Sequence, residues 1–236
     1  MTNLLILDPQ HQSLKRFLPS GTETYLANLL DRHAVVVRLS RPRRSKLGDH
    51  RAPSGGQRYH RVSINNDLNP YAFLTTLLHE IAHATAWKAH RQRARTIKPH
   101  GPEWKKAFES LLVPVVASHA LPEDVSTALA AFMRNPSATT CSDRTVVLAL
   151  ARYDNQESGQ VRVEQLPIDA VFRTSSGKLF RKGRKLRSRY QCHDYRTGRE
   201  YRVHALSCVE PITDQAGISR LVDGRSELKK RLLAIH

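Results

Sequence analysis

The chain of 236 residues has only three cysteines, and no two of them form a Cys-x-x-Cys pair. An odd number of widely spaced cysteines argues against a disulfide scaffold and is typical of a reducing compartment, so we expect a cytoplasmic protein. The sequence also has no apolar run near the roughly 20 residues that span a bilayer. Its N-terminus lacks the pattern of a secretory signal, and we expect no membrane partner.

Acidic residues are scarce as well. The chain has 21 Asp and Glu against 38 Lys and Arg, which gives a formal net charge of +17. This excess indicates an anionic partner, above all DNA, and a location at the nucleoid if the protein is bacterial. A basic surface that serves only solubility is the alternative. The hydrophobic fraction of 40% predicts a globular protein with one good core or two small ones.

The segment 77–84, Leu-Leu-His-Glu-Ile-Ala-His-Ala, is a candidate metal site. On an α-helix, His79 and His83 lie on the same face, about 6 Å apart along the axis, so both can bind one Zn²⁺. Glu80 lies beside them, placed to take a proton from water on the metal. The opposite face is apolar, with Leu74, Leu77, Leu78, Ile81, Ala82 and Thr85. The alternative is a solvated helix face that carries these polar residues by chance.

A catalytic zinc usually has a third protein ligand and one open position. His90 would lie about 10.5 Å along the helix from His83, too far to share the metal. His100 is the better candidate, because the segment 99–102, Pro-His-Gly-Pro, has the composition of a turn that can fold back over the helix. Pro102 then suits the first turn of a new helix. Glu103 is the main rival as third ligand.

Three segments stand out together: Lys46-Leu47-Gly48-Asp49 with Arg51, the segment 77–84, and His100-Gly101-Pro102-Glu103-Trp104. In combination they resemble the SprT-like (Spartan-related) zinc metallopeptidase family. They occur in the order of the family and at about its spacing, within roughly residues 15–118.

The resemblance implies a zinc metallopeptidase in which His79, His83 and His100 hold one Zn²⁺ and Glu80 is the general base. It also implies protein substrates, and the best understood role of the family is the cleavage of proteins bound or crosslinked to DNA. Two alternatives stay open. One is a nucleic-acid-binding module whose zincin-like domain is structural or inactive, and the other is a peptidase that acts on ordinary soluble proteins.

Periodicity predicts an α+β fold, in which a minimal zincin-type domain with a short antiparallel sheet precedes a small β-rich domain. In the first domain, residues 1–134, the expected elements are a helix over Thr22–Arg32, strands over Ala34–Leu39 and Arg58–Asn65, a basic loop over 41–61, the metal-site helix from Asn69-Pro70, and helices around Trp104–Leu112 and Pro122–Met133.

A breaker-rich linker, 135–141, leads to the second domain, 142–215, which precedes a helical tail, 216–236. The expected elements are strands over Thr145–Tyr153, Val161–Leu166, Ala170–Arg173, Arg187–Cys192 and Glu200–Leu206, and a final helix over about Arg225–Ile235.

Basic side chains crowd the segment 178–202, and aromatic residues interleave with them. Exposed aromatics could stack on unpaired bases, but we expect Phe180, Tyr190 and Tyr201 to form the inner face of the sheet. The charges can meet phosphates in either case. The predicted nucleic-acid contacts are Arg41, Arg43, Arg44 and Lys46 in the basic loop, and Arg181, Lys182, Arg184 and Lys185 in the second domain.

Many SprT-like proteins carry a C-terminal zinc ribbon built on paired cysteines, which this sequence lacks. A second metal site from Cys141, Cys192, Cys208 and a histidine such as His204 is conceivable. We favour the simpler interpretation, in which the cysteines are small buried or partly buried side chains.

Overall fold

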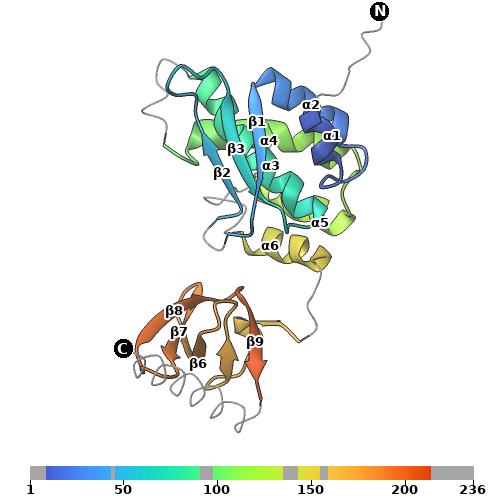
Figure 1. Ribbon diagram of the computed structural model, residues 1–236. Coiled ribbons are helices and arrows are strands. Elements are labelled where there is room, and N and C mark those ends of the chain that lie inside the picture. Colours follow the sequence, from blue (N-terminus) through green and yellow to red (C-terminus); the bar gives the residue numbers. More distant parts are fainter. Residues whose placement is uncertain (1–8, 44–45, 91–97, 135–142, 155–158, 214–236) are drawn as a thin grey trace, which may run out of the picture. The chain divides into compact units, whose positions relative to one another are not determined.

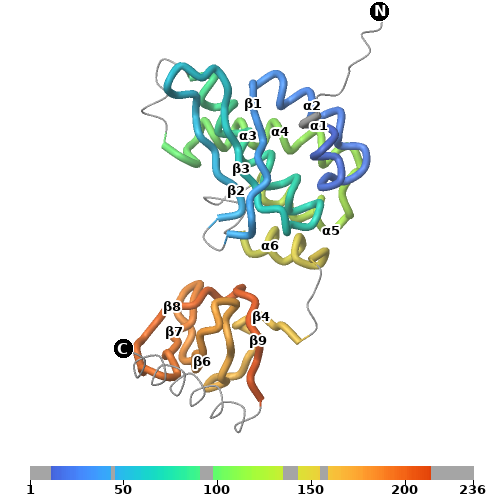
Figure 2. Tube along the Cα trace, in the orientation of Figure 1, coloured from blue at the N-terminus to red at the C-terminus, as the bar shows by residue number. Residues whose placement is uncertain are grey.

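The computed structural model describes residues 9–43, 46–90, 98–134, 143–154 and 159–213 (Figures 1 and 2). The chain divides into two compact units, Met1–Asn155 and Gln156–His236. Helices and two sheets confirm a mixed α+β architecture. None of the described helices is long and apolar enough to cross a membrane. The predicted linker 135–141 and the predicted tail helix lie outside the described residues.

The first unit contains the predicted helices and both predicted strands, together with elements that the sequence did not indicate. Its elements are α1 (Pro9–Lys15), α2 (Glu23–Arg32), β1 (Val35–Ser40), β2 (Gly48–Arg51), β3 (His60–Asn65), α3 (Pro70–Ala89), α4 (Pro102–Ala117), α5 (Glu123–Arg134), α6 (Arg144–Leu150) and the 3-10 turn η3 (Ala151–Tyr153).

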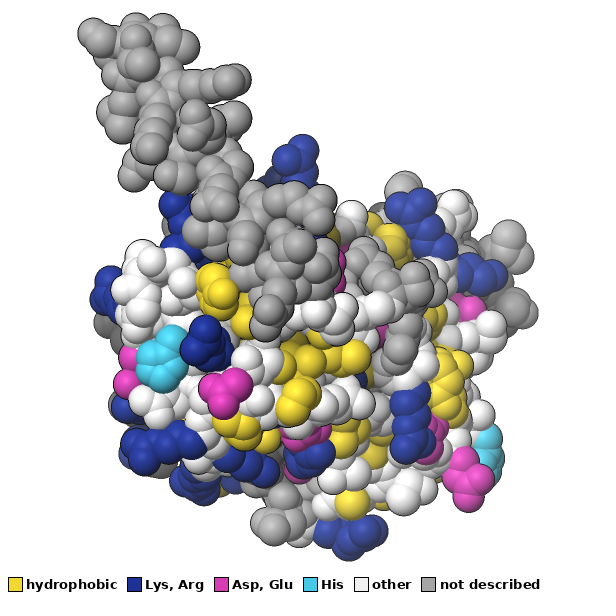
Figure 3. All heavy atoms as spheres, turned by 90° about the horizontal axis from the view of Figure 1, so that it is seen from below, with side chains coloured by type: hydrophobic (Ala, Val, Ile, Leu, Met, Phe, Trp, Pro, Cys, Tyr) yellow, Lys and Arg dark blue, Asp and Glu magenta, His cyan; other side chains and the backbone are white. Residues whose placement is uncertain are grey.

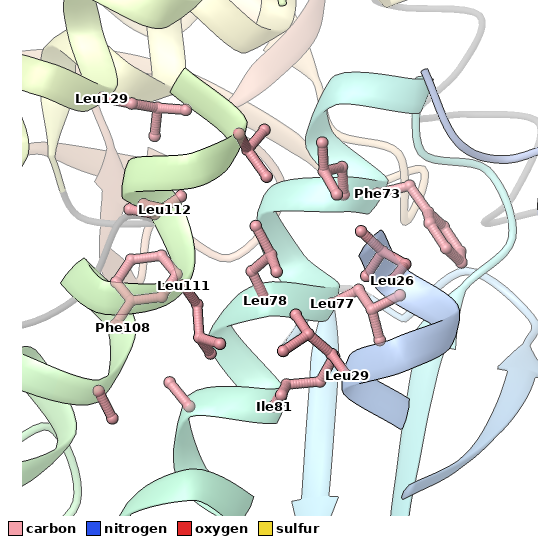
Figure 4. Close-up of a cluster of buried hydrophobic side chains, with 14 of the residues drawn as sticks. Leu26, Leu29, Phe73, Leu77, Leu78, Ile81, Phe108, Leu111, Leu112 and Leu129 are labelled. Carbon is pink, nitrogen blue, oxygen red and sulfur yellow. The ribbon is translucent and has the colours of Figure 1, made fainter. Parts of the chain in front are cut away.

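Helix α3 is the centre of this unit and is buried on nearly every side. Apolar side chains of α2 and α4 pack against it from two directions (Figure 4). The labelled core residues are Leu26, Leu29, Phe73, Leu77, Leu78, Ile81, Phe108, Leu111, Leu112 and Leu129. The face that carries His79 and Glu80 is buried too, with 8% and 6% of these residues exposed. A helix enclosed in this way can hold polar groups only where they have a function or a partner.

The three-stranded sheet has the order β1-β3-β2. Pairing of the two predicted strands is confirmed, but the expected antiparallel sheet is wrong, because β1 and β3 run parallel with Val37 opposite Val62. The connection between them is long enough for a parallel return, and it contains β2, which pairs antiparallel to β3. Strand β2 was not predicted, since Gly-Asp-His-Arg has no apolar alternation.

The strand predicted over Thr145–Tyr153 is wrong, since this segment forms α6 and η3. The Asp143 side chain caps α6 by accepting hydrogen bonds from the backbone of Thr145 (3.0 Å) and Val146 (3.1 Å). Val146 is fully buried in the core of the first unit. A cap and apolar burial thus outweigh the β-branched composition of the segment. The first unit therefore extends to Asn155, beyond the predicted linker.

The second unit is a six-stranded antiparallel sheet in the order β4-β9-β5-β6-β7-β8. Its elements are β4 (Val161–Arg162), the 3-10 turn η4 (Val163–Gln165), β5 (Val171–Arg173), β6 (Leu179–Lys185), β7 (Arg189–Asp194), β8 (Glu200–His204) and β9 (Cys208–Ile212). No strand was predicted over the residues that form β6 or β9. Phe180 and Tyr190 are buried, and Tyr201 packs against their cluster, which confirms the predicted inner face.

Candidate metal centre

Helix α3 places the first two candidate ligands and begins where the sequence predicts. The Asn69 side chain accepts hydrogen bonds from the backbone of Tyr71 and Ala72, both 3.0 Å, and Pro70 occupies the first turn. The Asn69 amide also donates to the carbonyl of Leu150 at 2.9 Å, which ties the start of α3 to the end of α6. From this fixed start, the helical repeat brings His79 and His83 to within 5.3 Å of each other, measured between ring centroids.

A tight turn brings His100 back to these two residues. His100 has a positive φ of 60°, and the backbone N–H of Gly101 donates to the carbonyl of Lys98 at 2.9 Å. Helix α4 starts at once with Pro102, as the sequence predicts. His100 Nε2 then lies 3.0 Å from His79 Nε2, and the ring of His100 lies 4.9 Å from that of His83.

The three histidines form a group whose ligand nitrogens all lie within 4.8 Å of one another. In the part of the chain that the structure describes, this is the one group of three or more His, Cys, Asp or Glu side chains placed to hold a metal ion. Glu103, the rival third ligand, is not part of it. Nor do Cys192 and Cys208 join His204 in a second group: Cys192 is buried, Cys208 is exposed, and Cys141 lies outside the described residues.

The electrostatics of the triad fit a metal ion. Burial lowers the pKa of His79 and of His83 to about 3, and burial also lowers the pKa of His100. All three imidazoles are therefore neutral near pH 7, the form that binds metals. His79 Nε2 and His100 Nε2 face each other at 3.0 Å, so these are the nitrogens placed to share one ion. Three neutral imidazoles are a donor set that zinc accepts.

Two aromatic side chains, Trp104 and His50, contact the three histidines and were not predicted to be part of the site. Trp104 packs against all three imidazoles, and its indole N–H donates to the carbonyl of His79 at 3.3 Å. His50 of β2 stacks on His83 at 5.6 Å and shares a 2.8 Å hydrogen bond with His60. Only the alternation of side chains along β2 could have indicated His50, and β2 itself was not predicted.

Glu80 lies in a buried position against the start of β2. Burial, with a smaller contribution from the Asp49 carboxylate, raises the pKa of Glu80 to about 8. Gly48 packs so closely on this side chain that a Cβ at Gly48 would lie 2.8 Å from Glu80 Cγ and 2.9 Å from Cδ. Beside the triad, a cavity of about 180 Å³ is lined by His50, Ala52, His83, Ala86, Trp87, Lys98, Pro99 and Trp104.

The predicted nucleic-acid contacts in the basic loop divide into exposed and engaged side chains. The Arg43 guanidinium donates to Asn65 Oδ1 and Ser63 Oγ, both 2.9 Å, and to the carbonyls of Ser63 and Leu47. It therefore holds the loop in place, and most of its N–H donors are not available to a phosphate, contrary to the prediction. Lys46 is exposed but pairs with Asp49 at 2.7 Å. Arg41 is exposed, and Arg44 lies outside the described residues.

In the second unit, the prediction for Lys182 is wrong. Lys182 is only 2% exposed, because it shares the inner face of β6 with Phe180. Its ammonium donates to the carbonyls of Leu166 and Glu164 and lies 4.0 Å from the centre of the Tyr190 ring. The other three predicted contacts on β6 are exposed: Arg181, Arg184 and Lys185.

Residues 15–121 match the model described as the SprT-like family, which confirms the resemblance read from the sequence. The match contains the three histidines, Glu80 and β2, and it ends before the second unit begins. A search of curated proteins and a search of solved structures give no match.

Proposed function

Residues 15–121 carry an SprT-like domain, a kind of domain associated with zinc metallopeptidases, and from this premise we propose that the protein is a zinc-dependent endopeptidase. The observation that supports the proposal most strongly is the convergence of His79, His83 and His100 with a buried carboxylate, Glu80, on the same helix. A metal site that only stabilises the fold has no need of a general base beside it.

In this proposal each residue has a defined task. The three imidazoles would hold one Zn²⁺, which when bound acts as a Lewis acid toward the scissile carbonyl and lowers the pKa of water. The positive charge of a bound Zn²⁺ would favour the carboxylate form of Glu80 over the protonated form that burial favours. Glu80 would then accept a proton from the attacking water and later deliver it to the leaving amine. The low solvent exposure of Glu80 keeps competing water away and strengthens its interaction with charge in the site.

Strand β2 offers a place for the substrate. It is an edge strand of the sheet order β1-β3-β2, and it packs against α3, which carries His79 and His83. An extended peptide can add to such an edge through backbone hydrogen bonds, which recognise many sequences. We therefore propose that the endopeptidase accepts substrates of many different sequences.

We further propose that the substrates are proteins bound or crosslinked to DNA. The net charge of +17 supports an anionic partner. On the face of the molecule in Figure 3, Lys and Arg side chains are spread widely, with Asp and Glu among them, so total charge does not by itself locate the contact. The exposed basic residues of β6 and of the loop before β2 are the candidates: Arg41, Lys46, Arg181, Arg184 and Lys185.

The decisive experiment is a cleavage assay on a DNA-binding protein, with and without DNA, combined with elemental analysis for zinc. Glu80→Gln should retain stoichiometric zinc and lose cleavage, whereas His83→Ala should lose both. Glu109→Gln is the matched control, because Glu109 is an exposed glutamate on α4 and should behave like the parent.

The outcomes separate the alternatives. Zinc without cleavage of any substrate would favour a structural or inactive domain in a nucleic-acid-binding module. Cleavage that DNA does not stimulate would favour a peptidase for ordinary soluble proteins. A purified protein without stoichiometric metal would refute the proposal.

A further inference from the structure

The sheet of the first unit has a second surface that the proposed metal chemistry does not use. Gly48 and His50 of β2 face α3, so Asp49 and Arg51, which alternate with them, face away. On this outer side lies a hollow of about 370 Å³. Its lining includes one acidic residue among the described ones, Asp49, and these basic residues: Arg38, Arg43, Lys46, Arg51 and Arg61.

The positive charges on this side are poorly balanced. Arg51 and Arg61 are direct cross-strand partners in the β2–β3 ladder, and like charges in that position destabilise a sheet. The Asp49 carboxylate is shared between Lys46 at 2.7 Å and Arg51 at 3.4 Å. Within the described residues, Arg38 and Arg61 are exposed and pair with no carboxylate. A bound anion would relieve this repulsion.

The same hollow has an apolar part. Val36 is 43% exposed and Tyr59 is 38% exposed, and both line the hollow beside Arg38 and Arg61. Arg61 lies opposite Val36 in the β1–β3 ladder, so cationic and apolar side chains are direct neighbours. An inorganic anion or a sulfated sugar would satisfy the arginines but would not use an exposed tyrosine ring.

We propose that this outer sheet face, defined by Val36, Arg38, Arg51, Tyr59 and Arg61, binds single-stranded nucleic acid. The arginines contact backbone phosphates, and an unpaired base stacks on Tyr59. A duplex keeps its bases stacked inside and leaves the tyrosine without a partner. The inference deepens the proposed function, on which its biological meaning rests, because it gives the peptidase unit its own contact with the nucleic acid that carries the substrate.

The test is the binding of a fluorescent oligothymidylate to the full chain, followed by anisotropy over a series of salt concentrations. The double variant Arg38→Gln with Arg61→Gln should lower the slope of log K against log salt by about 1.4, since each contact to a single strand contributes about 0.7. Tyr59→Ala should weaken binding about tenfold through the lost stack, and Tyr59→Phe should bind as the parent does. Far-UV circular dichroism reports whether each variant is folded, independently of the proposed zinc site.

The matched control is Lys106→Gln with Arg134→Gln, which removes two exposed charges from α4 and α5 and should leave the slope unchanged. An unchanged slope for the Arg38 and Arg61 variant, or an equal loss for the control, would overturn the proposal. So would equally tight binding of a duplex, or of heparin with no effect of Tyr59→Ala. Peptide cleavage by the parent protein is measured separately, so failure of the zinc chemistry and failure of this binding site remain distinguishable.

Discussion

The contact between Gly48 and Glu80 gives a sharp test of how the fold confines the proposed general base. Gly48 is not one of the glycines with positive φ, so the backbone of β2 accepts alanine there without strain. The new Cβ would lie closest to Glu80 Oε1 and 2.8 Å from Cγ, so the carboxylate side chain must move by at least about 0.6 Å to reach 3.4 Å, where ordinary contact begins. Because Glu80 is only 6% exposed, it has little room in which to move.

We therefore expect Gly48→Ala to reduce kcat/KM for a peptide substrate by at least about tenfold, since a displacement of 1 Å in a catalytic group can cost about a hundredfold. Zinc content should stay stoichiometric, because the three histidines lie on α3 and in the turn before α4. Overpacking should lower the free energy of unfolding by about 1–3 kcal/mol, measured by urea denaturation.

A double variant shows whether the loss acts through Glu80. Gly48→Ala combined with Glu80→Gln should be no less active than Glu80→Gln alone, because both changes disable the same group. Full activity of Gly48→Ala would show that β2 does not confine Glu80. If the double variant were less active than Glu80→Gln by the factor that Gly48→Ala costs alone, the loss would not act through Glu80.

Arg43→Lys keeps the charge but loses the planar fork, so we expect it to lower the free energy of unfolding by about 2 kcal/mol; an unchanged urea midpoint would contradict this structural role. In zinc-free protein, burial lowers the pKa of His50 to about 4 and of His79 to about 3, against 6.5 for free histidine. Below pH 6.5 the unfolded chain then binds more protons than the folded chain. The free energy of unfolding should therefore decrease as the pH is lowered from 6.5 toward 4, by up to about 1.4 kcal/mol per histidine for each pH unit. Urea denaturation at several pH values measures this, and a free energy of unfolding that does not change with pH would disprove it. Finally, changing three exposed basic residues of β6 to Gln should lower the salt slope of DNA binding by about 2, and an unchanged slope would exclude this strand as a phosphate contact. These residues are Arg181, Arg184 and Lys185.

The ligands of the candidate metal centre could be predicted because their signals are local. The spacing of His79 and His83 needs only the helical repeat, and the start of α3 needs only Asn69 and Pro70. His100 needed one more step, a turn rich in Pro and Gly, and the structure brings its Nε2 to 3.0 Å from His79 Nε2.

What the sequence could not decide depends on contacts between distant segments. Strand β2 has no apolar pattern and exists because it pairs with β3, so the closeness of Gly48 to Glu80 and of His50 to His83 could not be foreseen. The same applies to Lys182, whose charge predicts exposure. The pleat of β6 turns it inward, where backbone carbonyls and the Tyr190 ring replace water. Local spacing determines which residues can act together along a helix, and only tertiary packing decides which charges reach solvent and which groups are confined.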